Sequence, residues 1–387
     1  MTTHVSARIR TIPDSGLLRF FDILATMDDV LSLGIGEPDM PTPQPIRDAA
    51  VASIQRGQTG YTSNAGIREL RLEIAAYLRR RYGMVYDPDG EILVTVGVSE
   101  ALLAAMLALL DPGDAVLVPE PCFVAYDPSV RLASGTPIGV PTLAQEGFQV
   151  DVARLEAALT HRTRALLLGY PSNPTGAVLE RQRAMEVARF VAGHDLILIS
   201  DEIYDRFVYG VEHICLAALP GMQPRTLLLG GFSKSYAMTG WRVGYACGPR
   251  EIIAAMHKVH QYAIMSAPTP GQVAALEALS CAGDPAETIT REFSARRDVL
   301  LHGLRVIGLP CVEPRGAIYA FPSVAHLGFS AQAFSERLLL EEKVAVVPGN
   351  AFGPSGEGHV RIAYTVSSPV LEEALERLDR FVRRCRG

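Results

Sequence analysis

The chain has 387 residues, of which 48% are hydrophobic and 20% are charged, and its net charge is −6. This length favours two domains, or one large domain with a smaller appendage, and the composition is that of an ordinary globular protein rather than a disordered or fibrous one. The mildly acidic balance argues against nucleic acid or an anionic membrane surface as a partner.

The sequence also argues against membrane insertion and a disulfide framework. No stretch is long and apolar enough to span a bilayer, and the N-terminal segment MTTHVSARIRTIPDSG lacks the apolar core of a secretory signal. The six cysteines lie far apart without a CxxC pair, so neither disulfides nor a zinc site is expected. We therefore expect a cytoplasmic protein without a metal centre.

Lysine is scarce in this chain. Lysine and arginine together number 36, and only Lys234, Lys258 and Lys343 are lysine, which leaves 33 arginines. A coding bias toward arginine would explain the shortage. A lysine that persists against this bias draws attention, since arginine cannot lose its proton and act as a nucleophile.

Short apolar runs alternate with amphipathic segments along the first three quarters of the chain. The runs read as buried strands at 91–96, 115–120, 164–170, 196–202, 226–232 and 241–247. Helical patterns lie between them, at 99–110, 151–160 and 179–194. This alternation predicts an α/β fold with a mostly parallel sheet flanked by helices.

The pattern changes near residue 285. Long helices rich in Arg and Glu follow, with a short strand pair near Ala317–Phe321 and Val344–Val347 and a closing amphipathic helix from Pro369. We expect a large domain over 45–285 and a smaller α+β domain formed by 1–44 and 286–387.

Polar segments follow several of the predicted strands, and ligands in such folds bind at the carboxyl ends of parallel strands. In VTVGVSEALL (94–103), a strand passes through glycine into a helix, which leaves the amides of Val98 and Ser99 free to bind an anion. In GYPSNPTGAV (169–178), the motif NPTG consists of residues that favour turns, and a turn is the more common interpretation of such a motif.

Two further segments carry ionisable groups. ILISDEIYDRF (197–207) places Asp201 and Tyr204 after a buried strand, where an aspartate could pair with a protonated pyridine nitrogen. Magnesium binding is the alternative for Asp-Glu at a strand end, although no GxxxxGK[ST] loop accompanies it. GGFSKSYAMTGWRVGY (230–245) places Ser233, Lys234 and Arg242 together.

The chemistry of the last segment fits pyridoxal phosphate (PLP). A desolvated lysine has a lowered pKa and can attack an aldehyde to form an imine, while Ser233 and Arg242 suit a phosphate. A snorkelling lysine beside a loop arginine is the alternative for this segment taken alone. In HVRIAYT (359–365), Arg361 lies inside an apolar strand and requires a carboxylate, from the protein or from a substrate.

Taken in order, these segments resemble the class I/II aminotransferases, the aspartate-aminotransferase-like family of fold-type I PLP-dependent enzymes. The resemblance covers nearly the whole chain. Its most specific parts are YPSNPTG, SDEIY and SKSYAMTGWRVGY, supported by GEPDMPTP, GYTSNAGIRELR, VTVGVSEAL and HVRIAYT.

The resemblance implies a role for each candidate residue. Lys234 would form the Schiff base with PLP and shuttle protons, and Asp201 would pair with the pyridinium nitrogen. Tyr204 and Asn173 would bind the phenolic oxygen of the cofactor, and Phe123 would stack on its ring. The phosphate would be held by Ser233, Arg242 and the amides of Val98 and Ser99.

The resemblance also implies substrate and partner contacts. Arg361 would bind the α-carboxylate of the substrate, helped by Asn173 and the backbone around Gly36. Tyr61 would reach the phosphate in the neighbouring subunit, which implies a homodimer with shared active sites.

Two departures from the family pattern bear on specificity. Phe123 stands where relatives often have Trp or Tyr, so it keeps the π contact and loses a polar handle. Ser99 stands where some aspartate-preferring relatives carry a lysine, which puts a strong preference for dicarboxylates in doubt. Arg315 is one candidate for a substitute contact, with a solvated loop arginine as the alternative.

The sequence thus predicts a ping-pong aminotransferase that interconverts an L-amino acid and a 2-oxo acid. A PLP-dependent lyase, decarboxylase or cyclase with the same residues is the nearest alternative, because the bond that breaks depends on how the pocket orients it. A PLP-sensing regulator is a further alternative, and we expect no room for its DNA-binding domain because the resemblance begins near the N-terminus. The identity of the amino donor stays open.

Overall fold

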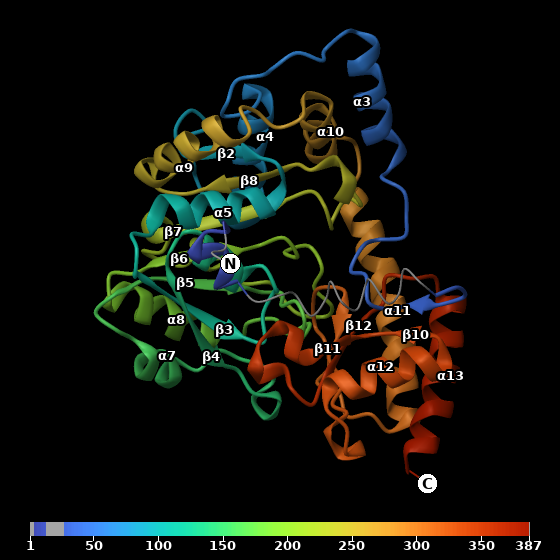
Figure 1. Ribbon diagram of the computed structural model, residues 1–387. Coiled ribbons are helices and arrows are strands. Elements are labelled where there is room, and N and C mark those ends of the chain that lie inside the picture. Colours follow the sequence, from blue (N-terminus) through green and yellow to red (C-terminus); the bar gives the residue numbers. More distant parts are fainter. Residues whose placement is uncertain (1–3, 13–26, 387) are drawn as a thin grey trace.

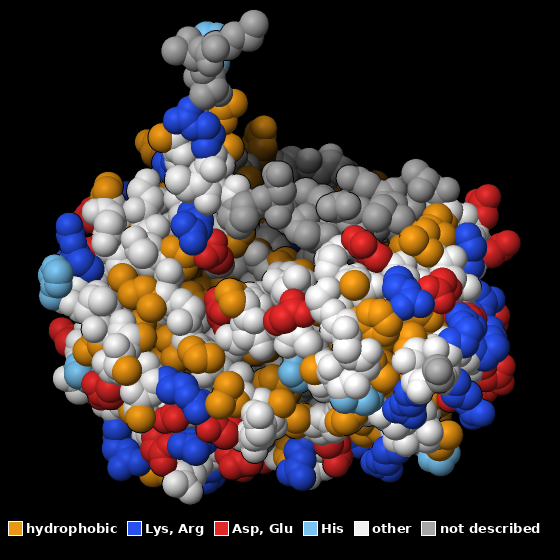
Figure 2. Space-filling model, turned by 60° about the horizontal axis from the view of Figure 1, so that its bottom comes forward, with side chains coloured by type: hydrophobic (Ala, Val, Ile, Leu, Met, Phe, Trp, Pro, Cys, Tyr) orange, Lys and Arg blue, Asp and Glu red, His pale blue; other side chains and the backbone are white. Residues whose placement is uncertain are grey.

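The computed structural model describes residues 4–12 and 27–386. The parts of the expected small domain at 1–3 and 13–26, and its last residue, 387, lie outside the described residues. Across the ranges that are described, no helix is long and apolar enough to cross a membrane. Acidic and basic side chains are interspersed over the face shown in Figure 2.

A seven-stranded sheet forms the centre of the large domain, in the order β2-β8-β7-β6-β5-β3-β4. Only β8 runs against its neighbours, because its pairings with β2 and β7 are antiparallel and the remaining pairings are parallel. The strands are β2 Ile92–Thr95, β3 Ala115–Glu120, β4 Thr136–Pro141, β5 Thr163–Gly169, β6 Ile197–Asp201, β7 Thr226–Gly231 and β8 Gly244–Cys247.

All six strands predicted in this region are present, and the structure adds β4. This strand carries Pro137 and Pro141 and is largely solvent-accessible, so it lacks the apolar pattern of the others. Proline is tolerated at a sheet edge, where a missing amide donor leaves no gap in the ladder. Its position at the edge explains why the apolar pattern did not reveal it.

Helices cover both faces of the sheet because successive side chains of each strand point to opposite sides. Leu167 of β5 packs with α5, α6 and α9, whereas Leu166 and Leu168 pack with α7 and α8. Helices α3, α4 and α10 pack beside β2, β7 and β8 (Figure 1). The helices are α3 Gln44–Gln55, α4 Arg68–Tyr82, α5 Gly97–Leu109, α6 Tyr126–Leu132, α7 Val152–Ala158, α8 Arg181–Gly193, α9 Arg250–Ala263 and α10 Thr269–Ser280.

The smaller domain is α+β and gathers chain from both ends. The parallel pairing of β1 with β10 brings Leu31 opposite Val344, so the blue strand β1 lies among orange and red elements (Figure 1). Its strands are β1 Leu31–Ser32, β9 Tyr319–Ala320, β10 Val344–Ala345, β11 Val347–Pro348 and β12 Val360–Ala363. Its helices are α11 Pro285–Ile307, α12 Ala331–Glu342 and α13 Ser368–Arg386, and a short helix, α1 Ala7–Arg10, lies near the N-terminus.

The predicted pairing between Ala317–Phe321 and Val344–Val347 was wrong. Strand β12 lies between β11 and β9 and pairs antiparallel with both, while β10 pairs with β1. Short buried strands in one lobe have the same apolar texture whatever their neighbour, so the sequence pattern does not specify partners.

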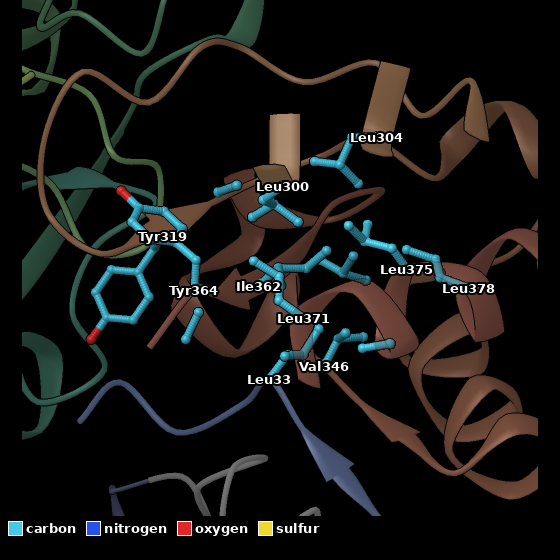
Figure 3. Close-up of a cluster of buried hydrophobic side chains, with 14 of the residues drawn as sticks. Leu33, Leu300, Leu304, Tyr319, Val346, Ile362, Tyr364, Leu371, Leu375 and Leu378 are labelled. Carbon is cyan, nitrogen blue, oxygen red and sulfur yellow. The ribbon is translucent and has the colours of Figure 1, made fainter. Parts of the chain in front are cut away.

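The core of the small domain places β12 against long helices. Leu300 and Leu304 of α11 face Leu375 and Leu378 of α13 in one buried cluster, next to Ile362 of β12 (Figure 3). Tyr204 and Phe207 of the large domain join the same cluster. The cluster therefore packs the two domains together at the position where β12 enters the cleft between them.

Candidate active site

A cleft of about 310 Å³ lies between the two domains, in the size range of small-molecule sites. It is bounded by loops that follow β5, β6 and β7 and by residues of β9 and β12. Its lining includes all of the predicted site residues except Tyr61 and the candidate substitute contact Arg315, namely Gly36, Val98, Ser99, Phe123, Asn173, Asp201, Tyr204, Ser233, Lys234, Arg242 and Arg361.

Neighbouring parallel strands deliver the central groups of the cleft. Gly169 at the end of β5 pairs with Asp201 at the end of β6, and Asp201 pairs with Leu229 of β7. Ser233 and Lys234 lie in the turn directly after β7. The register of the sheet thus brings segments that are distant in sequence to one edge, as the fold requires.

The amine of Lys234 lies inside this cleft. Its side chain is half-buried, and Nζ donates a hydrogen bond of 2.6 Å to the backbone oxygen of Gly36. Gly36 has no room for a side chain, since a Cβ there would lie 1.9 Å from the hydroxyl oxygen of Tyr319. The N-terminal loop can therefore approach the lysine closely only because residue 36 is glycine.

Asp201 is a buried carboxylate without an ion-pair partner among the described residues. It accepts hydrogen bonds from the hydroxyl of Tyr126 at 2.9 Å and from the amide of Ile203 at 3.1 Å. Burial raises its pKa to about 6, and the hydrogen bond from Tyr126 opposes that rise. A buried carboxylate of this kind is stabilised by a cation brought into the cleft.

Tyr126 is a residue of the cleft that was not predicted from the sequence. The sequence did place Tyr126 near a predicted site residue, because it follows Phe123 by three positions, at the start of helix α6. In the structure its ring meets that of Phe123 edge-on, with the ring centroids 5.7 Å apart. No property of the residue itself marks it as the partner of Asp201. That pairing depends on where α6 packs against the sheet.

Helix α5 presents its N-terminus to the cleft. The helix begins at Gly97, whose φ of +72° favours glycine, and a Cβ at Gly97 would lie 2.7 Å from Nη2 of Arg242. Arg242 is held by a 2.9 Å hydrogen bond from Nη1 to the backbone oxygen of Thr239. Backbone amides of a helix start, an arginine and the nearby Ser233 are groups that could hold an anion.

Arg361 projects from β12 into the opposite side of the cleft. Nη1 donates to the side-chain oxygen of Asn173 at 3.0 Å, and Nη2 donates to the backbone oxygen of Gly34 at 2.6 Å. The guanidinium lies 4.5 Å from the ring centre of Tyr319 and 4.7 Å from that of Phe352.

Arg361 has unused capacity to bind an anion. Within the described residues, no carboxylate lies within ion-pair distance of it, and its buried Nε has no hydrogen-bond partner. Burial lowers the pKa of the guanidinium. A buried arginine of this kind is costly unless a carboxylate joins it, so the position fits a carboxylate ligand.

Tyr204 has a partner that the sequence did not predict. Its hydroxyl lies 2.7 Å from that of Tyr319, and burial raises the pKa of Tyr204 well above its usual value. Tyr319 comes from β9 of the small domain, so this contact joins the two sides of the cleft. The motif EPRGAIYAF gives no sign of it.

Two predicted residues lie outside the cleft. Tyr61 is 86% exposed on the loop between α3 and α4. Arg315 is also exposed and borders a separate hollow with Gln149 and Arg181, which agrees with a solvated loop arginine.

The Asp-Glu pair after β6 separates into two environments. Asp201 faces the cleft, whereas Glu202 binds Nε2 of His213 at 2.6 Å and accepts the hydroxyl of Ser200 at 2.7 Å. In the described part of the chain, no group of three or more His, Cys, Asp or Glu side chains could hold a metal ion.

The fold and the cleft define a class of protein. A large domain with a mostly parallel sheet, a smaller α+β domain and a lysine in the cleft between them form a fold-type I PLP-dependent transferase, and solved structures agree. One is the aromatic aminotransferase from Pyrococcus horikoshii, with a TM-score of 0.90, 44% identity and coverage of 94% of this chain and 99% of that one.

The sequence identifies the family. Residues 28–378 match the family described as aminotransferase class I and II, to which this chain belongs. It is 48% identical to the protein YugH of Bacillus subtilis over 99% of this chain and 100% of that protein. It is 43% identical to an aspartate aminotransferase of Pyrococcus abyssi over 98% of each chain.

The chain is therefore an aminotransferase, an enzyme that transfers nitrogenous groups, in a family that uses PLP and acts on amino acids and 2-oxo acids. The comparisons do not favour the alternative of a lyase, decarboxylase or cyclase.

Proposed function

We propose that this chain binds PLP covalently through Lys234 and uses it to move an amino group from an L-amino acid to a 2-oxo acid in a ping-pong cycle. The observation that carries the proposal is that the Lys234 amine shares one cleft with a buried carboxylate, Asp201, and a buried arginine, Arg361. Among the described residues, neither of these two groups has an ion-pair partner. A pyridinium and a substrate carboxylate would supply the two missing charges.

The residues present fit the cofactor at each of its ends. Asp201 would pair with the pyridine nitrogen, and Phe123 would stack on the ring. Tyr204 and Asn173 would bind the phenolic oxygen. The anion site formed by Ser233, Arg242 and the amides of Val98 and Ser99 would hold the phosphate, where Gly97 leaves Arg242 the space that a Cβ would fill.

When bound, PLP would supply an electron sink for the charge that develops at the α-carbon of the amino acid. The chain's own residues have separate tasks. The negative charge of Asp201 would keep the cofactor nitrogen protonated. Arg361 would orient the amino acid by its α-carboxylate, together with Asn173 and the backbone at Gly36. Nζ of Lys234 would take the proton from the α-carbon as a general base.

The proposal is tested by following both products of transfer. The purified enzyme with PLP is incubated with a panel of amino donors, including aspartate and an aromatic amino acid, and with a 2-oxo acid acceptor. We expect equal amounts of new amino acid and new 2-oxo acid. Release of ammonia without an acceptor would contradict transamination, and the panel also identifies the preferred donor.

A homodimer with shared sites is part of the proposal. Tyr61 and Tyr262 are 86% and 88% exposed. The loop of Tyr61 is tied to the segment after α9, since Asn64 donates to the backbone oxygen of Met265 and Thr269 donates to that of Gly60. Exposed apolar side chains that gather on one surface are typical of an interface, and these contacts join the loop of Tyr61 to the segment that carries the exposed Ile264 and Met265.

Sedimentation of the enzyme tests the dimer, and Tyr61→Phe tests the shared site. We expect the enzyme to sediment as a dimer and Tyr61→Phe to have a lower affinity for PLP than the wild type. A monomer that binds PLP with full affinity would contradict both.

The cellular location and the domain limits complete the proposal. All six cysteines are free, which supports a reducing compartment such as the cytoplasm. A large domain over 45–285, with 1–44 and 286–387 in the small domain, is supported by the pairing of β1 with β10 and by the start of α11 at Pro285.

A further inference from the structure

The turn from β2 into α5 carries the amides proposed to bind phosphate, and several contacts fix its shape. The hydroxyl of Thr95 donates to the backbone oxygen of Gly97 at 2.9 Å. On the other side, Gly244 of β8 lies so close that a Cβ on it would be 2.7 Å from the carbonyl carbon of Gly97. The turn is therefore closely packed against β8 and tied to the end of β2.

Glu100 supplies a third constraint from inside the helix. Val96 precedes the first residue of α5 and has no side chain that could cap the helix. Its amide donates instead to Oε2 of Glu100 at 2.5 Å. A carboxylate in the first turn that reaches back to the residue before the helix stabilises the helix start. Glu100 binds the amide of Val96, and among the described residues the next three amides, of Gly97, Val98 and Ser99, have no hydrogen-bond acceptor and are available to a ligand.

The carboxylate of Glu100 is held by a buried histidine. Oε1 of Glu100 lies 2.5 Å from Nδ1 of His260, which projects from α9 and is fully buried. Nε2 of His260 has no hydrogen-bond partner among the described residues. This favours the tautomer with its proton on Nδ1, because that proton is then donated to Glu100 and Nε2 leaves no unpaired N–H.

Glu100 places a negative charge next to a proposed anion site. A carboxylate one residue beyond the proposed phosphate site repels an anion, and an uncharged side chain would avoid that repulsion. The geometry accounts for the residue type, because one oxygen fixes the amide of Val96 while the other is held by His260. Both of its oxygens are directed to named donors, so the side chain is fixed rather than free to turn toward the anion site.

We infer that His260 and Glu100 are positioning residues for the phosphate of the cofactor, acting through the amide of Val96 to set the direction of the amides at the start of α5. This inference rests on the proposed function. It assigns a task in ligand binding to a pair that touches no ligand, and it predicts that the pair matters for the phosphate and not for the rest of the cofactor.

The test compares PLP with pyridoxal, which lacks the phosphate. Apoenzyme is titrated with each compound for the wild type, Glu100→Ala and Glu100→Gln. We expect Glu100→Ala to weaken PLP binding about tenfold, the size of one lost hydrogen bond and cap. Pyridoxal binding should be unchanged. Glu100→Gln keeps an oxygen for the amide of Val96, so it should bind PLP within about threefold of the wild type.

The histidine is tested in the same way. His260→Ala should weaken PLP binding and spare pyridoxal, whereas His260→Asn places an amide donor near the position of Nδ1 and should restore binding. In the double variant, the two alanine effects should be less than additive, because both act through one carboxylate. If Glu100→Ala does not fold, as judged by its circular dichroism and melting temperature, His260→Ala provides the same comparison.

Two results would overturn the inference. One is PLP binding by the alanine variants equal to that of the wild type. The other is an equal loss of PLP and pyridoxal, which would mean a general structural role. Failure of the proposed function is distinct from both, since the wild-type chain itself would then take up no PLP.

Discussion

The two walls of the cleft are built in different ways. The cofactor wall, formed by Asp201, Ser233, Lys234 and Arg242, comes from consecutive strands of one sheet and the turns that follow them. The substrate wall is centred on Arg361, whose contacts reach back 188 residues to Asn173 and 327 residues to Gly34. One wall is fixed by the register of a sheet, whereas the other depends on how the small domain packs against the large one.

This difference suggests that the two walls can be altered separately. The cofactor wall keeps its geometry as long as the sheet is intact. The substrate wall is held by the packing of β9 and β12 on α11 and α13, together with the contact between Tyr204 and Tyr319. Changes on one wall should therefore affect the binding of one ligand and leave the other nearly unaffected.

The largest effect is expected at the point that both walls share. Lys234→Ala should lower kcat by about 10⁴-fold or more, because it removes both the covalent attachment and the general base. The visible absorbance band of lysine-bound PLP should also disappear. Lys258→Ala is the matched control, since Lys258 is an exposed lysine on α9. A persistent band in Lys234→Ala would refute the assignment.

Arg361→Leu should break the substrate wall alone. Loss of a buried charge that holds a carboxylate costs about 2–5 kcal/mol, so kcat/KM for the amino donor should fall about 30-fold to several thousandfold. The Kd for PLP should stay within about threefold of the wild type. Arg315→Leu removes an exposed arginine outside the cleft and serves as the control. A large change in PLP affinity would mean that the walls are coupled.

Asp201→Asn tests whether the carboxyl group in the cofactor wall is buried, by its effect on the free energy of unfolding. Burial raises the pKa of Asp201 from its ordinary 3.8 to about 6, so the carboxyl group binds its proton more tightly in the folded apoprotein than in the unfolded chain. Its contribution to stability is present below about pH 4 and is lost as the pH rises through about 6, by about 3 kcal/mol in all. The asparagine variant has no such group to ionise.

The measurement is the free energy of unfolding of both apoproteins in denaturant across this pH range. The difference between variant and wild type should grow in favour of the variant from pH 4 to above pH 6 and then level off. A difference that does not change with pH would show that the carboxyl of Asp201 is not desolvated as described.

Arg242→Leu should alter the cofactor wall and leave the substrate wall unchanged. Removing an arginine from a phosphate site loses charge-assisted hydrogen bonds of about 1.5–3 kcal/mol, so the affinity for PLP should fall about 10-fold to 150-fold. At saturating PLP, the KM for the amino donor should be nearly that of the wild type. A rise in that KM as large as the loss of PLP affinity would argue against two separable walls.

Most of the cofactor wall could be predicted from the sequence. Buried parallel strands are recognisable by their apolar runs, and their carboxyl ends meet at one edge, so the residues after each run were expected together. Lys234 was further marked by the scarcity of lysine in the chain. The sequence also marked Arg361 as an arginine inside an apolar strand, and the family resemblance implied that it binds the substrate carboxylate. The structure places Arg361 in the same cleft.

Tertiary structure alone decided the partners of these residues. Tyr126 meets Asp201, Tyr319 meets Tyr204, and His260 meets Glu100 across separations of 75, 115 and 160 residues. Asp201 and Tyr204 were marked by the sequence, but their partners Tyr126 and Tyr319 have the sequence pattern of ordinary core residues. His260 and Glu100 likewise resemble an ordinary core residue and an ordinary capping residue. The reversed direction of β8 and the place of β12 between β9 and β11 were also hidden. Periodicity reports which face of an element is buried, because burial is local, whereas the choice of neighbour depends on the packing of the whole chain.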